Sequence, residues 1–133
     1  SMIEISDESE VSRATLYNHY RDKESVLRAL AESEFARLIA VAQKGSSPQE
    51  ILQLLSEEIS TDTALATMRT TDPALLTQIL THQSDELWSS FLHSFSQLIP
   101  NHVLAATSLR WLIGQVFAPL TPEQSKIQSE ALS

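Results

Sequence analysis

Helix-start signals recur along this chain, and they constrain its fold more than any other feature. Ser47-Pro48-Gln49-Glu50 and Thr121-Pro122-Glu123-Gln124 share one pattern, and Asp72-Pro73 repeats part of it. A Ser or Thr hydroxyl accepts a hydrogen bond from a backbone N–H one turn ahead, and a Glu or Gln side chain can bond back. Proline suits the first helical position. We therefore expect helices that begin near residues 48, 73 and 122.

Between these signals the apolar residues follow the helical period, as in the stripe Leu27, Ala31, Phe35, Leu38 and Ala42. No run alternates as a strand would, and two glycines are too few for a chain of tight β-turns. We expect an all-α fold, with helices near 3–9, 12–20, 23–44, 48–60, 62–70, 73–98, 102–118 and 122–132. The segment Thr81–Ser84 is the weakest point of the helix over 73–98.

Composition excludes several classes of protein. The 133 residues suffice for one modest domain, or one domain and part of another, and an apolar share of 42% can fill a core. Without cysteine there is neither a disulfide scaffold nor a thiolate metal site, which suits a reducing cytoplasm. The longest apolar runs are far shorter than the roughly 20 residues that span a bilayer. We expect a cytoplasmic protein with no membrane partner.

The sequence contains no convincing catalytic or metal-binding pattern. His82 and Glu86 stand four apart and could share a helix face, but two ligands do not make a metal site. His93 and His102 have no evident acidic or nucleophilic partner. Gly-rich phosphate loops and the Gly-x-Ser-x-Gly motif are absent. We expect no enzyme activity, no metal and no cofactor.

The charge is distributed unevenly. The chain carries a net charge of −8, yet Val11–Arg28 holds four basic residues against two acidic ones. A basic end on an acidic body can attract phosphate at one surface, although a solvated helix face with a chance cluster explains the pattern equally well. Within this window, Val11–Glu24 predicts a short helix that turns into a long one. Its outward side chains carry hydroxyls, an aromatic ring and basic groups. Such side chains suit a helix in a major groove, and they suit plain solvent exposure as well.

Val11–Glu24 closely resembles the recognition helix of TetR/AcrR-type bacterial transcriptional regulators. In that family Val-Ser-x-x-Thr-Leu-Tyr-x-His-Phe/Tyr-x-x-Lys-Glu marks this helix and the start of the next, and the match here has no gap. Weaker resemblance to the effector-binding region covers Asp62–Leu80 and Leu109–Thr121. The resemblance implies a partial helix-turn-helix DNA-binding domain with a long connecting helix over 1–45, and an effector-binding and dimerisation domain over 46–133.

The implied function is a ligand-responsive, DNA-binding regulator of the repressor type. Phosphate contacts would fall to Ser12, Thr15, Tyr17 and Lys23, and base contacts to Arg13, Asn18 and His19. Two departures from the family pattern weaken the expected DNA-binding domain. The chain starts almost at the family's second helix, and Glu10 replaces a favoured glycine of the turn. We therefore expect poor binding of operator DNA by this chain. The alternative is a stand-alone module that binds a small molecule and dimerises without contacting DNA.

The body would hold the effector pocket and the dimer contact. Apolar walls with a few polar groups suit a small apolar effector, although the same stripes also suit a plain core. The candidate pocket residues are Leu65, Met68, Leu76, Ile79, Leu80, His82, Trp88, Phe91, Leu92 and Phe95. A homodimer would pair helices 102–118 and 122–132 across a two-fold axis, with packing inside one subunit as the competing explanation. The candidate dimer residues are Leu109, Leu112, Ile113, Val116 and Ile127.

Overall fold

The computed structural model describes residues 23–81 and 86–133, and within these ranges the chain is all-α, without strands. The expected fold class is confirmed. The helices are α3 (Lys23–Ala42), α4 (Pro48–Thr61), α5 (Thr63–Thr71), α6 (Pro73–Thr81), α7 (Glu86–Leu98), α8 (His102–Phe117) and α9 (Pro122–Leu132). The helix expected over 73–98 is present as α6 and α7, and the helices expected over 3–9 and 12–20 lie outside the described residues. None of the described helices combines the length and the apolar character needed to cross a bilayer.

The predicted start signals of α4 and α9 form caps. The hydroxyl of Ser47 accepts from the backbone N–H of Glu50 at 3.2 Å, while the carboxylate of Glu50 accepts from the side chain of Ser46 at 3.2 Å and not from the backbone of the cap. At α9 the capping box is complete: Thr121 Oγ1 accepts from the N–H of Gln124 at 3.2 Å, and Gln124 Oε1 accepts from the N–H of Thr121 at 3.0 Å. Such caps satisfy backbone donors that a helix end leaves free, so these starts were predictable from local sequence.

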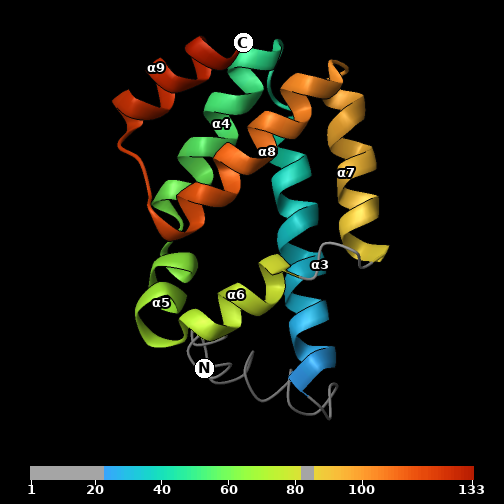
Figure 1. The fold of residues 1–133 in the computed structure, drawn as a ribbon, viewed down its shortest axis with the longest axis vertical. Helices are drawn as coiled ribbons and strands as arrows, with labels where there is room; N and C mark the ends of the chain where they lie inside the picture. Colours follow the sequence, from blue (N-terminus) through green and yellow to red (C-terminus); the bar gives the residue numbers. More distant parts are fainter. Residues whose placement is uncertain (1–22, 82–85) are drawn as a thin grey trace.

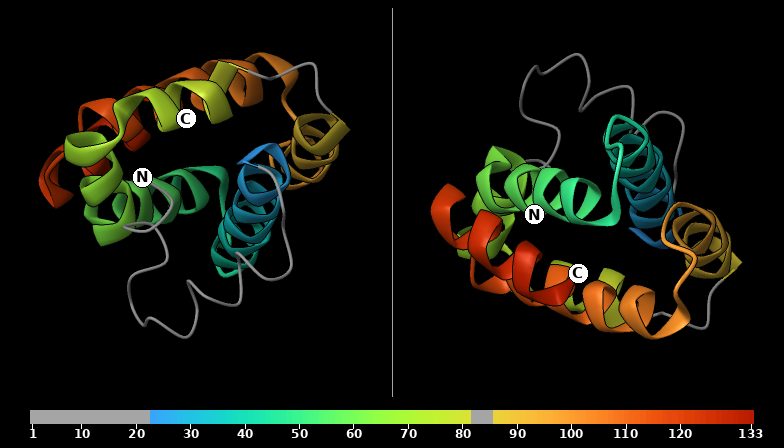
Figure 2. Two further views of the ribbon diagram at one scale, coloured as in Figure 1. Left: turned by 90° about the horizontal axis from the view of Figure 1, so that it is seen from below. Right: turned by 90° about the horizontal axis from the view of Figure 1, so that it is seen from above.

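The helices form two layers around one core. Helices α3 and α4 lie on one side and α6 and α8 on the other, while α7 packs against α3 and α8 at one end (Figures 1 and 2). Helix α5 contacts both α6 and α8, and α9 rests on α4. Each helix thereby buries one of its faces against a neighbouring helix, either in the opposite layer or in the same layer.

The core is built mainly from aliphatic and aromatic side chains of α3 to α8, and α9 adds the partly buried Leu132. Leu52, Leu75 and Phe95 are among those fully shielded from solvent. Of the apolar stripe expected on α3, Ala31, Leu38 and Ala42 are buried. Helix α3, which the sequence assigned to the 1–45 segment as a connecting helix, therefore packs into the same core as α4 and α7.

The turn between α3 and α4 depends on a glycine. A Cβ placed on Gly45 would lie 2.6 Å from Ile51 Cγ1 and 2.9 Å from the backbone nitrogen of Ile51. The backbone at Gly45 has no positive φ, so the requirement is for space and not for an unusual conformation. The absence of a side chain lets the first turn of α4 fold back closely against the end of α3.

Small polar residues line the contact between α4, α8 and α9. Ser56, Gln115 and Ser125 are buried, and Ser56 Oγ lies 2.6 Å from Gln115 Oε1 and 2.6 Å from Ser125 Oγ. Further along, Gln49 Nε2 donates to Ser129 Oγ at 3.1 Å. We call these side chains the serine seam. It joins α9 to α4 through hydrogen bonds that keep its buried hydroxyls satisfied.

Candidate functional site

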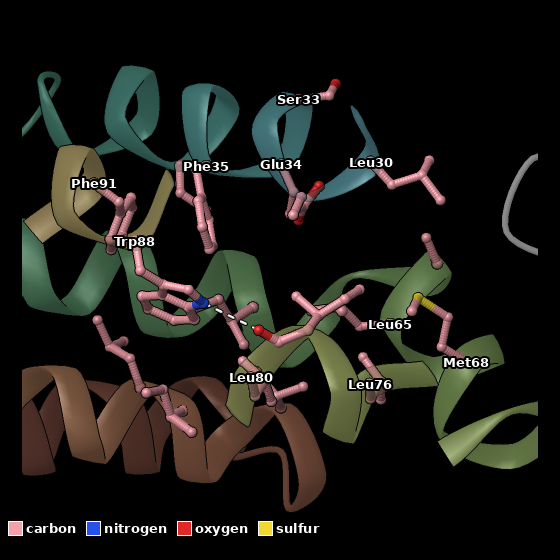
Figure 3. Close-up of a pocket in the computed structure, with 18 of the residues that line it drawn as sticks. Leu30, Ser33, Glu34, Phe35, Leu65, Met68, Leu76, Leu80, Trp88 and Phe91 are labelled. Atoms are coloured by element: carbon pink, nitrogen blue, oxygen red, sulfur yellow. Dashed lines mark hydrogen bonds between the residues drawn. The ribbon is translucent and has the colours of Figure 1, made fainter. Parts of the chain in front are cut away.

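A cavity of about 220 Å³ opens between the two layers. Its walls come from six helices, α3 to α8, and apart from Ser33 and Glu34 every lining residue is apolar (Figure 3). The lining residues are Leu30, Ala31, Ser33, Glu34, Phe35, Leu38, Leu55, Ile59, Ala64, Leu65, Met68, Leu76, Ile79, Leu80, Trp88, Phe91, Leu109, Leu112, Ile113 and Val116. A cavity of roughly 150 Å³ can hold benzene. This one has room for a somewhat larger apolar molecule.

Three aromatic rings make one wall of the cavity. Phe35 of α3 lies with its ring centroid 4.7 Å from that of Trp88 in an edge-on arrangement, and 4.7 Å from that of Phe91 in a tilted one. The indole N–H of Trp88 donates to the carbonyl oxygen of Ile79 at 3.0 Å, shown as the dashed line in Figure 3. Because that donor is occupied, the wall presents ring surface to the cavity.

The polar end of the cavity lies on α3, where Glu34 extends toward the interior (Figure 3). Arg37, one turn later, ion-pairs with Glu34, with Glu58 of α4 and with Asp62. Its Nη2 atom donates to Asp62 Oδ2 at 2.6 Å, and its Nε atom donates to Glu34 Oε2 at 3.2 Å. We call Arg37 and these three carboxylates the Arg37 cluster. Its formal charge is −2, because one guanidinium faces three carboxylates.

The cluster ties the cavity wall to the start of α5. Asp62 Oδ1 accepts from the backbone N–H groups of Ala64 at 2.8 Å and of Leu65 at 3.1 Å, and both residues line the cavity. The hydrogen bond to Glu34 and the surrounding carboxylates raise the pKa of Arg37 above its ordinary value, against the lowering effect of partial burial. Arg37 therefore stays charged and links α3 to both α4 and α5.

Seven of the ten expected pocket residues line this cavity: Leu65, Met68, Leu76, Ile79, Leu80, Trp88 and Phe91. The expected Phe95 does not line it, because it sits one turn beyond Phe91, stacks on that ring at a centroid distance of 6.0 Å and is buried in the core. The expected Leu92 is half-buried and is not a lining residue either. The expected His82 lies outside the described residues.

Sequence reasoning missed the contribution of α3 and α4. Their lining residues include Glu34, Phe35 and Leu55. In the sequence, only the apolar stripe of α3 indicated that this helix has a buried face. The dimer candidates Leu109, Leu112, Ile113 and Val116 also line the cavity, and Leu112 and Val116 are buried within the single chain. Packing inside one subunit, the competing explanation, therefore accounts for these four positions.

A different face of α8 and α9 is exposed. The dimer candidate Ile127 on α9 is 56% exposed, and Val103 and Phe117 on α8 are 76% and 46% exposed. Gly114 lies on the same exposed side of α8, where an added Cβ would meet no atom within 4 Å. We refer to these four exposed positions of α8 and α9 together as the outer face.

The expected DNA contacts Ser12, Arg13, Thr15, Tyr17, Asn18 and His19 lie outside the described residues. Lys23 is the first residue of α3, and its side chain is likewise outside what the structure describes. Among the described residues, no group of three or more His, Asp or Glu side chains is arranged to hold a metal ion. The chain matches no model of a known protein family, no curated protein and no solved structure. The cavity and the stretch Val11–Glu24 are therefore the two features that bear on its function.

Proposed function

We propose that this chain is the effector-sensing part of a cytoplasmic, ligand-responsive transcriptional regulator of the repressor type. The observation that carries the proposal is the apolar cavity between the helical layers, which has the lining of a small-molecule site and a larger volume than a cavity that holds benzene. Six of its lining residues lie in the segment from Leu30 to Leu38 on α3. That helix begins at Lys23, at the end of the stretch Val11–Glu24 that resembles a recognition helix and the start of the next helix.

In this proposal, helix α3 couples ligand binding to DNA binding. A ligand that fills the cavity touches Ala31, Phe35 and Leu38, so its fit depends on where α3 lies relative to α5 and α8. It can shift the regulator between two states only by as much as its affinity differs between them. In a dimer, movement of α3 would change the spacing of two recognition helices, which is ideally about 34 Å for successive major grooves.

The dimer contact belongs on the outer face of α8 and α9. Val103, Phe117 and Ile127 expose apolar side chains there, and Gly114 permits close approach of a second backbone. A two-fold arrangement would set the same patch of each subunit against its partner. Four of the five residues first expected in this contact line the cavity, so the proposal keeps only Ile127 of them and adds Val103, Gly114 and Phe117.

The ligand-binding half of the proposal is tested with N-phenylnaphthylamine, an apolar dye that fluoresces on leaving water. We expect saturable binding by the purified chain and thermal stabilisation, since a ligand at about 100 times its Kd adds about 2.7 kcal/mol to stability. Leu65→Trp places a larger side chain in the cavity and should weaken binding at least about tenfold. Leu98→Trp, at a half-buried position outside the lining, is the matched control and should bind as the unmodified chain does. Failure of the dye to bind, or equal binding by Leu65→Trp, would contradict the proposal.

The DNA-binding half is tested by fluorescence anisotropy with a duplex from the region upstream of the chain's own gene. A version extended in frame upstream should bind that duplex with an affinity that falls steeply as salt rises, because phosphate contacts release counterions. The chain itself should bind weakly. If the extended version also fails to bind while the dye binds, the stand-alone ligand-binding module is the better description.

A further inference from the structure

We propose that the cavity selects an amphipathic organic cation, an apolar body with an ammonium or similar head, whose charge is held by Glu34. This inference names the effector's chemical class and rests on the proposed function. The lining is uneven: its two polar residues, Ser33 and Glu34, are both on α3, while the other lining residues are apolar. A ligand that fits this cavity has an apolar body and at most one polar end, which must face Glu34.

The charge around Glu34 decides the sign of that polar end. Glu34, Glu58 and Asp62 all turn toward Arg37, so one cation is shared among three carboxylates. Arg69 on α5 is directed elsewhere, since its Nη1 atom donates to the carbonyl oxygen of Val116 at 2.7 Å. The excess of −2 in the Arg37 cluster attracts a cationic head and repels a carboxylate or phosphate placed at the same point.

Glu34 is also accessible enough to take a second partner. Its side chain retains 35% of its exposure while it is paired with Arg37, and it lines the cavity in the same conformation. Each carboxylate offers two oxygens with about four acceptor positions, so Glu34 can accept from a ligand ammonium without releasing Arg37. The cation would thus add a positive charge where the cluster lacks one.

The aromatic wall favours the same kind of ligand. Phe35, Trp88 and Phe91 converge on the cavity with ring centroids 4.7 to 6.0 Å apart. Ring surfaces of this kind pack against an apolar, and especially an aromatic, body through offset or edge-on contacts. A cationic head near Glu34 with its apolar body along these rings satisfies both ends of the cavity at once.

The test uses three naphthalene probes of matched size that differ in charge: naphthylmethyl trimethylammonium, naphthylethanol and naphthylacetate. Binding of each to the purified chain is measured by calorimetry. We expect the cation to bind tightest and the anion weakest, with at least about a tenfold difference in Kd between them. This preference should shrink as salt rises, because Glu34 is partly exposed and its charge is screened.

Two glutamine variants assign the preference to one residue. Glu34→Gln keeps the shape of the side chain and should bring the cation's Kd to within about threefold of the neutral probe's. Glu123→Gln makes the same change at an exposed position on α9, outside the cavity, and should keep the full preference. Equal or better binding of the neutral or anionic probe by the unmodified chain would overturn this inference and leave the proposed function standing. If Glu34→Gln keeps the full preference for the cation, the inference is likewise overturned while the proposed function stands. Binding of none of the three probes would overturn the inference, and if N-phenylnaphthylamine also fails, the proposed function with it.

Discussion

Replacing Arg37 with methionine should destabilise the protein by about 2 kcal/mol. Methionine keeps an unbranched apolar stem, so packing along α3 changes little and the loss is electrostatic. The pairs with Glu34 and Glu58 involve side chains that are 35% and 40% exposed, and solvent screening limits each to about 0.5 kcal/mol. The pair with Asp62, whose side chain is 12% exposed, contributes about 1 kcal/mol. The three carboxylates left without a cation then repel one another.

The dependence on salt separates this reasoning from a simple packing defect. Raising the ionic strength from about 0.05 M to about 1 M shortens the Debye length to about 3 Å, which weakens the attraction in the original protein and the repulsion in the variant. The difference in unfolding free energy between the two proteins, measured by urea denaturation, should therefore shrink with salt. Arg110→Met, at an exposed position on α8, is the matched control and should cost less than about 0.5 kcal/mol. A loss below that value for Arg37→Met, or a loss that grows with salt, would refute the reasoning.

Three further substitutions are predicted from local geometry, each followed by urea denaturation. Gly45→Ala should destabilise by about 2 kcal/mol, because the new Cβ lies 2.6 Å from Ile51 Cγ1 and 2.9 Å from its backbone nitrogen; an unchanged midpoint would mean that α4 shifts freely. At protein concentrations where the chain is monomeric, Gly114→Ala should stabilise by about 0.5 to 1 kcal/mol, since the added methyl meets no atom of the single chain within 4 Å and alanine favours the helix; destabilisation of the monomer would contradict this. Leu52→Ala should cost about 3 kcal/mol because the side chain is fully buried, and dye binding by the folded variant should persist since Leu52 does not line the cavity; loss of binding would contradict this.

The helices were predictable because their signals are local. Ser47 and Thr121 cap within one turn of their own backbone, and the buried Ala31, Leu38 and Ala42 of α3 follow the helical period. No long-range information is needed for either feature.

The cavity was only partly predictable, because residues that line a cavity and residues that fill a core follow the same apolar pattern in sequence. Phe91 and Phe95 occupy equivalent positions one turn apart on α7, yet only Phe91 lines the cavity. The difference depends on where α3 lies, which the pattern along α7 does not contain. The Arg37 cluster was missed for a related reason: Arg37 and Asp62 are 25 residues apart, and only the packing of α3 on α4 brings them together.

The serine seam fixes how α9 is positioned along α4. Apolar side chains could slide past one another by a fraction of a turn at small cost, whereas Ser56 within 2.6 Å of both Gln115 Oε1 and Ser125 Oγ leaves one alignment in which each hydroxyl is satisfied. A shift of α9 by one turn would leave buried serine hydroxyls without hydrogen-bond partners. The exposed Ile127 is therefore held in a constant position relative to α4, so that a second subunit docking there would meet a preset surface instead of one that adjusts to it.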